Sequence, residues 1–227
     1  MNFDLTYFIR SLPQLLSYLP ITLILSVLSM LLSVMLGIII ESMIRSRIKG
    51  IYAAAHAYIL FFRSTPLLVQ LFLLYYGLPQ LFPALSAMNA FQATVIGISL
   101  NNGAYLAEIF RAAIDSVDRG QSEAAQSVGM TRLQTFRRIV FPQAHRVALP
   151  SLGNTFLVII KETSLGFTLG LTEMMGQAKL MAADTLKVME AFLSVSLLYL
   201  IVALFFGKLQ GLLEKKVGKP FVQQDNR

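Results

Sequence analysis

The sequence predicts an all-α membrane protein with five transmembrane helices. Of its 227 residues, 56% are hydrophobic and only 14% are charged, whereas soluble domains are about 25% charged. Uncharged runs of 30 and 44 residues lie between Arg10 and Glu41 and between Arg63 and Glu108. These runs are continuously apolar and do not alternate, which favours helices over the strands of a membrane barrel. The absence of cysteine excludes disulfides and thiolate metal sites.

A bilayer core of about 30 Å requires about 20 residues of helix. The first uncharged run is too long for a cleaved signal peptide and contains no A-x-A site. The second expected span contains Pro66, so a re-entrant segment is an alternative, but its length favours a crossing, and membrane helices tolerate proline. The third expected span lies in the 44-residue run. Only Lys161 and Glu162 interrupt the fourth span with charge, and the fifth span contains the uncharged run 191–207. The expected helices cover residues 14–42, 52–78, 86–111, 147–172 and 188–212.

The distribution of Lys and Arg predicts the orientation of the chain. Of the 19 basic residues, 14 lie in one set of connections, three lie in the other, and two, Arg63 and Lys161, lie within spans. Basic residues accumulate on the cytoplasmic side of a membrane. The amino terminus is therefore expected outside and the carboxyl terminus in the cytoplasm. The net charge of +7 then requires no nucleic acid as a partner.

One cytoplasmic connection, about residues 118–142, is longer and more polar than the others. Asp118 is expected to cap a short helix that Gly129 ends, because glycine readily adopts the left-handed conformation. Thr131 and Gln134 form a capping box that opens a second helix, which Pro142 is expected to end. Two interpretations remain open: an amphipathic linker on the lipid headgroups, or a protruding loop that docks into a partner. The small Ala124 and Ala125 favour the second.

The loop also resembles a known signature. Glu123, Ala124, Ala125, Gly129, Ile139 and Pro142 are spaced as in the EAA signature of permease subunits of ATP-binding-cassette (ABC) importers, although Phe141 replaces the usual Leu. Residues 62–72, FRSTPLLVQLF, are similar to FRGTPLLVQLF of the polar amino acid branch. Gly120 and Gln121, residues 104–111 and residues 161–165 match the same branch.

The resemblance covers about residues 10 to 215 and implies a type I importer permease. Residues 1–217 would form the transmembrane domain and residues 218–227 a short cytoplasmic tail. The implied partners are two ATP-binding subunits, a second permease (identical or related), an extracytoplasmic amino acid-binding protein and membrane lipid. The implied location is the bacterial inner membrane. The loop would couple to the ATPase through Gln121, Glu123, Ala124, Ala125, Gly129, Ile139 and Pro142.

The chain itself carries no motif for catalysis. The P-loop pattern GxxxxGK[ST] is absent, because Gly207-Lys208 lacks the upstream Gly and the following Ser or Thr of that pattern. His56 and His145 are 89 positions apart and belong to no metal-binding pattern. We therefore expect no enzyme activity, cofactor or metal on this chain, with ATP and Mg²⁺ bound by the partner ATPase.

Polar residues within the spans are candidates for the substrate path. At roughly 1.5 Å per residue, Arg63 and Lys161 would lie at similar depth in the outer half of the bilayer. Intramembrane charges usually face a protein or aqueous interior, and Glu162 would attract the ammonium group of an amino acid. Alternatively, Lys161 reaches the headgroups and Arg63 pairs with Glu162 structurally. The candidates are Arg63, Asn101, Asn102, Lys161, Glu162, Thr163 and Ser164, although the two hydroxyls are typical of helix packing.

Three functions compete. The first is import of polar amino acids, cystine or basic amino acids among them, by an ABC importer. The second is an ion- or proton-coupled carrier that needs no ATPase, but such carriers often contain inverted repeats, and none is visible. The third is a membrane scaffold that recruits a cytosolic protein, which leaves the charges within the spans unexplained. The sequence favours the importer.

Overall fold

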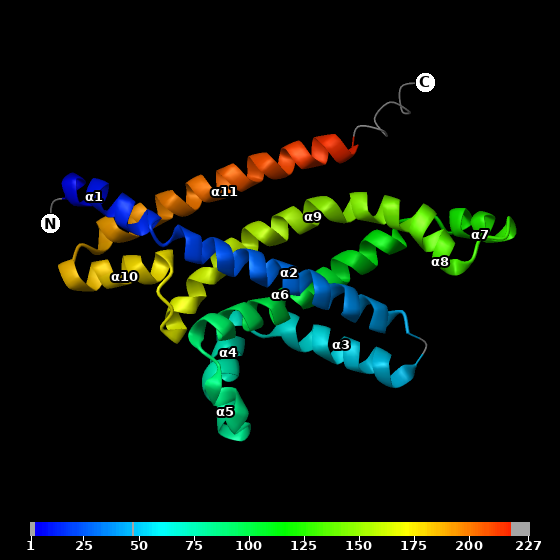
Figure 1. Ribbon diagram of the computed structural model, residues 1–227, viewed down its shortest axis with the longest axis horizontal. Helices are drawn as coiled ribbons and strands as arrows, with labels where there is room; N and C mark the ends of the chain where they lie inside the picture. The colour runs from blue at the N-terminus through cyan, green and yellow to red at the C-terminus, as the bar shows by residue number, and fades with distance from the viewer. Residues whose placement is uncertain (1–2, 47, 219–227) are drawn as a thin grey trace.

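The computed structural model describes residues 3–46 and 48–218. The predicted tail, 218–227, lies outside the described residues except for Gly218. Every regular element in the described part is helical (Figure 1). The α-helices are α1 Leu5–Leu16, α2 Leu19–Ile44, α3 Lys49–Ser64, α4 Leu67–Phe72, α5 Leu78–Leu81, α6 Ala90–Asp115, α7 Arg119–Ser127, α8 Arg132–Thr135, α9 Phe141–Glu162, α10 Met174–Thr185 and α11 Val188–Gly218. Two π-helical segments, Leu73–Gly77 and Phe136–Val140, and two 3-10 segments, Pro83–Ala87 and Thr163–Leu169, join them.

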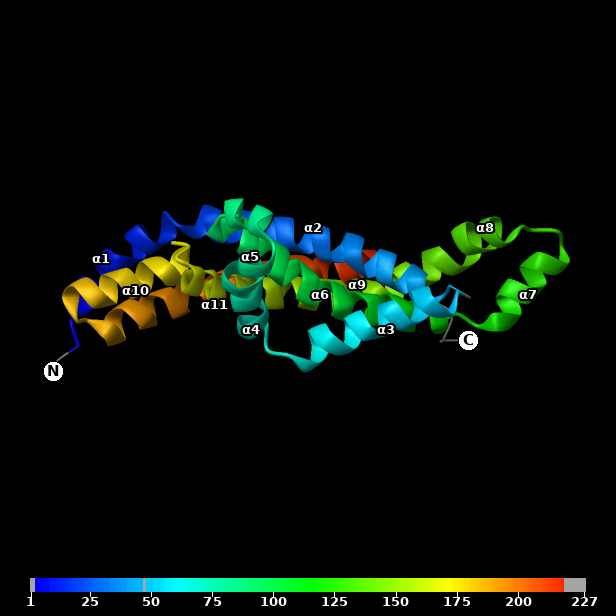
Figure 2. The same cartoon turned by 90° about the horizontal axis from the view of Figure 1, so that it is seen from below.

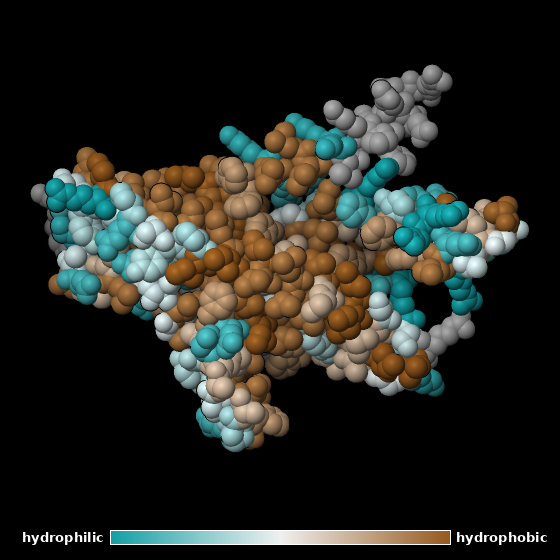
Figure 3. Space-filling model, viewed as in Figure 1, coloured by the Kyte–Doolittle hydropathy of each residue, from teal (hydrophilic) through white to brown (hydrophobic). Residues whose placement is uncertain are grey.

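The bundle is elongated and has two distinct ends. α1, α10 and the start of α11 form one end, and α7 and α8 project at the other (Figures 1 and 2). On the face seen in Figure 3, apolar residues cover the middle and polar residues gather mainly toward the two ends. Among the described residues, α2 and α11 are by themselves long and apolar enough to cross a membrane. The bent pairs α3 with α4–α5, and α8–α9 with α10, pass the same test when each is taken as one unit.

α2 and α6 pack closely through small residues. The buried face of α2 carries Thr22, Ser26, Ser29, Ser33 and Gly37 at intervals of three or four. Small residues let two membrane helices approach each other, which increases their van der Waals contact. An added Cβ on Gly37 would lie 2.8 Å from Leu106 Cβ and 3.2 Å from the Ala107 nitrogen. The α2–α6 pair therefore depends on the absence of a side chain at position 37.

Replacing Gly37 by Ala is expected to lower the melting temperature of the purified protein, because overpacking costs about 1–3 kcal/mol. Gly207 is the matched control, since nothing lies within 4 Å of a Cβ added there in the middle of α11. Gly207→Ala should leave stability unchanged or raise it slightly. Thermal unfolding in detergent measures both variants. Equal melting temperatures would contradict the close approach of α2 and α6.

Several predicted boundaries are wrong, each for a local reason. The first expected helix divides at Ser17 and Tyr18, where Pro20 lies in the first turn of α2, a position that proline favours. The expected helix 52–78 breaks at Thr65, whose extended backbone (φ −113°, ψ 144°) is the conformation that a following proline imposes. The two parts meet at 111°, and α4 and α5 project from the bundle as an arm (Figure 1).

The fourth expected helix also differs from the structure. Pro142 does not end the preceding helix but lies in the first turn of α9, directly after the π-helical segment Phe136–Val140. A π turn widens the backbone locally, so the chain continues past the proline ring. At its other end, α9 changes at Thr163 to a 3-10 helix that runs to Leu169.

Polar contacts fasten α1 to the α10–α11 turn. Lys187 Nζ lies 2.5 Å from Asp4 Oδ2 and 4.7 Å from the centre of the Tyr7 ring. Glu190 Oε1 accepts a hydrogen bond from the Asp4 backbone N–H at 2.9 Å. The hydrogen bond from Lys187 holds the pKa of the Asp4 carboxyl below its ordinary value. The first helix, which the sequence did not predict separately, is therefore fixed to the bundle.

Candidate functional site

An open groove of about 570 Å³ lies between the start of α4, α6 and α9. Its lining includes Glu162 from α9 and the Asn101–Asn102 pair from α6. Thus three of the residues predicted for a substrate path lie together. The remaining lining residues are Thr65, Pro66, Leu67, Tyr105, Ile109, Ser151, Asn154, Thr155 and Val158. We call this the α6–α9 groove.

The carboxylate of Glu162 is held by Asn102. Asn102 Nδ2 donates a hydrogen bond of 2.6 Å to Glu162 Oε2 and another of 3.1 Å to the Ile98 carbonyl. Among the described residues, no Lys or Arg forms an ion pair with Glu162. Of the described residues that line the groove, Glu162 is the only charged one, a suitable partner for a cationic group.

Asn101 fixes the opposite wall of the groove. Its Nδ2 donates to the Phe62 carbonyl and to Gln70 Oε1, each at 3.0 Å. Gln70 Nε2 in turn donates to Phe62 O, Thr65 O and Thr65 Oγ1 at 2.8–3.1 Å. These contacts satisfy carbonyl groups that the break before Pro66 leaves without helical partners. Sequence reasoning missed Gln70, because we expected an unbroken helix through Pro66; the proline four residues before Gln70 was the available signal.

Replacing Gln70 by Leu is expected to destabilise the protein by roughly 2–3 kcal/mol, because it removes the four hydrogen bonds that the Gln70 amide makes with Asn101, Phe62 and Thr65. The control is Gln80→Leu, because Gln80 is exposed and its amide donates to the Tyr76 carbonyl of its own turn. Unfolding of the two purified variants in denaturant compares them. A Gln70→Leu protein as stable as the Gln80→Leu protein would show that Gln70 does not hold the break.

The other predicted residues do not line this groove. Lys161 is exposed and points elsewhere than the adjacent Glu162, as expected for neighbours on a helix. Thr163 Oγ1 donates to the Ile160 carbonyl at 2.8 Å, and Ser164 Oγ donates to the Lys161 carbonyl at 2.6 Å. Both hydroxyls are thus satisfied by their own helix, as the helix-packing interpretation predicted.

Arg63 lies in a neighbouring groove and pairs with a residue that the sequence did not single out. Its Nη1 is 3.7 Å from Glu108 Oε2, and its guanidinium lies over the Tyr105 ring at 5.4 Å. The predicted alternative, a pair between Arg63 and Glu162, is wrong. Helical side chains lean toward the amino-terminal end of the helix, and Arg63 shares its groove with His56, Ile59 and Leu60 of the preceding turns of α3.

In the 118–142 loop, most of the predicted local structure is confirmed. The Gly129 N–H donates to the Gln126 carbonyl and the Met130 N–H to the Ala125 carbonyl, the two hydrogen bonds of a Schellman motif. Gly129 has φ +85°. Thr131 and Gln134 form the predicted capping box. Asp118 occupies the N-cap position of α7, but its side chain makes no capping hydrogen bond.

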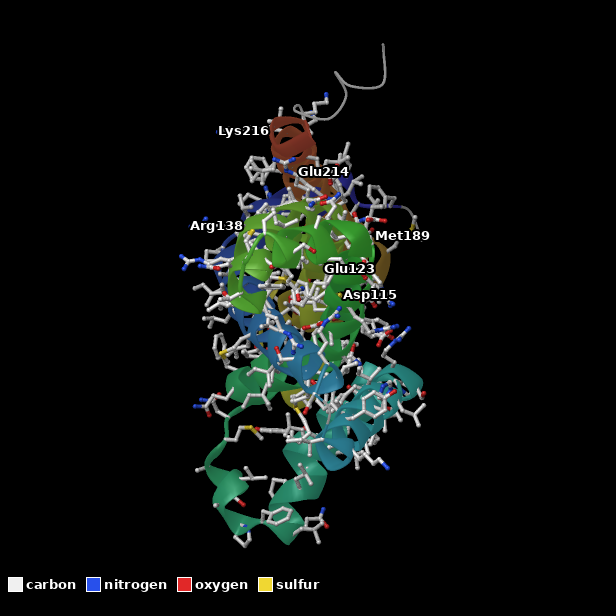
Figure 4. The ribbon with its side chains drawn as sticks, turned by 90° about the vertical axis from the view of Figure 1, so that its right-hand side faces the viewer. Asp115, Glu123, Arg138, Met189, Glu214 and Lys216 are labelled. Carbon is white, nitrogen blue, oxygen red and sulfur yellow. The ribbon has the colours of Figure 1, made fainter. Side chains whose placement is uncertain are left out.

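The surface of this loop is partly apolar. Val128 is 80% exposed and Leu133 72% exposed, and they flank the turn at Gly129. Ala124 is exposed, whereas Ala125 is only 8% exposed and packs within the loop. Gln143 Nε2 donates to Gln121 Oε1 at 2.6 Å and so ties α7 to α9. Figure 4 views the molecule from this end, with Glu123 on α7 and Arg138 on the π-helical segment.

Across residues 3–46 and 48–218, no group of three or more His, Cys, Asp or Glu side chains could hold a metal ion. The two candidate functional features are a polar groove among apolar helices and a projecting loop with an exposed apolar turn.

Comparisons with known proteins agree with this architecture. Residues 33–219 match the family described as "Binding-protein-dependent transport system inner membrane component". The chain is 48% identical over 218 residues to the probable amino-acid permease protein YxeN of Bacillus subtilis (strain 168), covering 96% of this chain and 97% of that protein. It is 38% identical over 221 residues to the L-cystine transport system permease protein TcyL of the same strain, covering 96% and 92%.

Among solved structures, the chain resembles one described as the crystal structure of an amino acid ABC transporter with histidines. The TM-score is 0.87 and the identity 38%, with 95% of this chain and 100% of that chain covered. Both chains therefore share the type I permease fold along nearly their whole length. The chain belongs to the family of inner-membrane permease components of binding-protein-dependent ABC transport systems.

Proposed function

We propose that this chain is the permease subunit of an ABC importer that carries polar amino acids across the bacterial inner membrane into the cytoplasm. Membership of the permease family and the names of the similar proteins support this function. The observation that carries it in the structure is the Glu162 carboxylate, held by Asn102 in an open groove among membrane helices. A carboxylate among membrane helices is costly unless it serves a cationic group or faces water.

The proposed topology has five crossings with the amino terminus outside. α2, α6, α9 and α11 would each cross, and α3 with the α4–α5 arm would form the bent fifth crossing. The asymmetry of basic residues supports this orientation. So does the position of the 118–142 loop, at the opposite end from α1 (Figure 1).

In this proposal the substrate path runs through the α6–α9 groove. The ammonium group of the amino acid would approach Glu162, while Asn101 and Asn102 hold the walls in place. Lys161, Thr163 and Ser164 would support the local helix geometry outside the groove. L-Cystine is one candidate substrate, because it is the substrate named for one of the similar proteins.

The 118–142 loop would couple the permease to an ATPase. The exposed Val128 and Leu133 present an apolar surface to a partner, and Gln121 and Gln143 brace the loop against α9. Glu123, Ala124, Gly129, Ile139 and Pro142 complete the proposed coupling segment, and Ala125 supports it from within. Two ATP-binding subunits, which would bind the ATP and Mg²⁺, a second permease and an extracytoplasmic binding protein would complete the transporter.

Reconstitution tests the proposed function. The chain is co-expressed with its candidate ATPase, incorporated into liposomes with the binding protein, and offered radiolabelled L-cystine, L-arginine and L-glutamine. ATP-dependent uptake is expected for at least one of them. Uptake driven by a proton or sodium gradient in the absence of the ATPase would instead support the alternative, an ion-coupled carrier.

A further inference from the structure

A second groove, of about 500 Å³, lies between α3 and α6 and adjoins the α6–α9 groove. Tyr105 lines both grooves and so forms part of the wall between them. The second groove is also lined by Arg63, Glu108 and Arg111. We call these three charged residues the α3–α6 triad.

The triad contains two cations and one anion. Glu108 Oε2 lies 2.7 Å from Arg111 Nη2 but 3.7 Å from Arg63 Nη1. The Arg63 and Arg111 side chains are each 44% exposed, and Glu108 is 23% exposed. Among the described residues, the Arg63 guanidinium makes no hydrogen bond within the chain and is held over the Tyr105 ring. The triad thus has one excess positive charge and a guanidinium with free donors.

The triad lies further along α6 than the Glu162 contact. From Asn102 to Glu108 is six residues, roughly 9 Å of helix, in the direction of Asp115 and the 118–142 loop. In the proposed orientation this direction leads to the cytoplasm. A molecule leaving Glu162 inward would therefore pass Tyr105 and then meet the triad.

We infer that the α3–α6 triad is a second, weaker binding step for the carboxylate of the amino acid on its way to the cytoplasm. The planar guanidinium groups of Arg63 and Arg111 match a carboxylate in a bidentate geometry. Glu108 already occupies Arg111 and competes with the carboxylate of the substrate. This competition keeps binding weak enough for release, the requirement for passage through any multi-site path.

The inference rests on the proposed function and extends it to the inward end of the path. It also assigns different roles to the two ends of the substrate: the ammonium group meets Glu162, and the carboxylate meets the triad. No group is transferred and no covalent bond changes, so the whole effect lies in binding and release.

The test measures how substrate trapped inside proteoliposomes inhibits uptake. ATP-driven uptake is recorded with whichever of L-cystine, L-arginine or L-glutamine the wild-type importer carries, at increasing concentrations of the same amino acid in the lumen. Arg63→Gln weakens binding of the substrate carboxylate to the α3–α6 triad and should raise the inhibition constant about fivefold or more. Glu108→Gln removes the competing carboxylate and should lower that constant about fivefold or more. The KM for the loaded binding protein outside should change less than twofold.

Opposite shifts for these two variants distinguish a binding step from a structural ion pair, whose loss would affect both variants alike. Lys161→Gln is the control, since Lys161 is a basic residue outside both grooves, and it should leave the inhibition constant unchanged. Arg63→Lys, which keeps the charge but loses the planar fork, provides a milder variant if Arg63→Gln assembles poorly. Wild-type uptake with equal inhibition constants in all variants would overturn this inference alone, whereas no ATP-driven uptake by the wild type would overturn the proposed function as well.

Discussion

Replacing Glu162 by Ala is expected to reduce ATP-driven amino acid uptake about 10- to 100-fold while the permease still assembles with its ATPase. The physical reason is the loss of the carboxylate in the α6–α9 groove, since a hydrogen bond or ion pair to a charged group contributes about 1.5–3 kcal/mol. The change also removes the acceptor of the 2.6 Å hydrogen bond from Asn102. Uptake into proteoliposomes, normalised to the amount of assembled complex, measures the effect.

Two further variants separate charge from structure. Glu162→Gln keeps an acceptor for Asn102 but loses the negative charge, so it should be nearly as inactive as the Ala variant. Lys161→Ala changes the adjacent residue, which is exposed and lies outside the groove, and should retain normal uptake. Normal uptake by Glu162→Ala at equal complex levels would remove this carboxylate from the substrate path.

Replacing Gly129 by Val is expected to reduce co-purification of the ATPase about tenfold or more. Gly129 has φ +85°, a conformation that costs a residue with a Cβ atom about 1–2 kcal/mol and a β-branched residue more. The Schellman turn between α7 and α8 would then open and displace the exposed Val128 and Leu133. A loss of 1.4 kcal/mol in binding already corresponds to a tenfold weaker complex.

The matched control is Gly50→Val, in the first turn of α3. Neither glycine has an atom within 4 Å of an added Cβ, but Gly50 has no positive φ. The two variants therefore differ in backbone strain and not in crowding. Gly50→Val should retain the ATPase at the wild-type level. Equal capture of the ATPase by both variants would show that the turn at Gly129 does not position the coupling surface.

The sequence by itself determined the features that depend on local chemistry. Long uncharged runs revealed the apolar helices, because burying charge in a bilayer is costly at any position. Gly129 and the Thr131–Gln134 pair revealed the bend in the loop, since their hydrogen bonds join residues at most five positions apart. The family resemblance rested on such motifs and was confirmed over nearly the whole chain.

Only the tertiary structure decided which distant residues meet. Arg63 pairs with Glu108 and not with Glu162 because the α3 side chain reaches back along its helix. The sequence favoured an unbroken crossing through Pro66, whereas the structure turns there by 111°, with a hydrogen bond between Gln70 and Asn101 of different helices beside the break. Asn102 and Glu162, 60 positions apart, share a groove because α6 and α9 pack against each other. The spacing of residues determines which side chains share a face of one helix, whereas the packing between helices determines which residues of other helices those side chains contact.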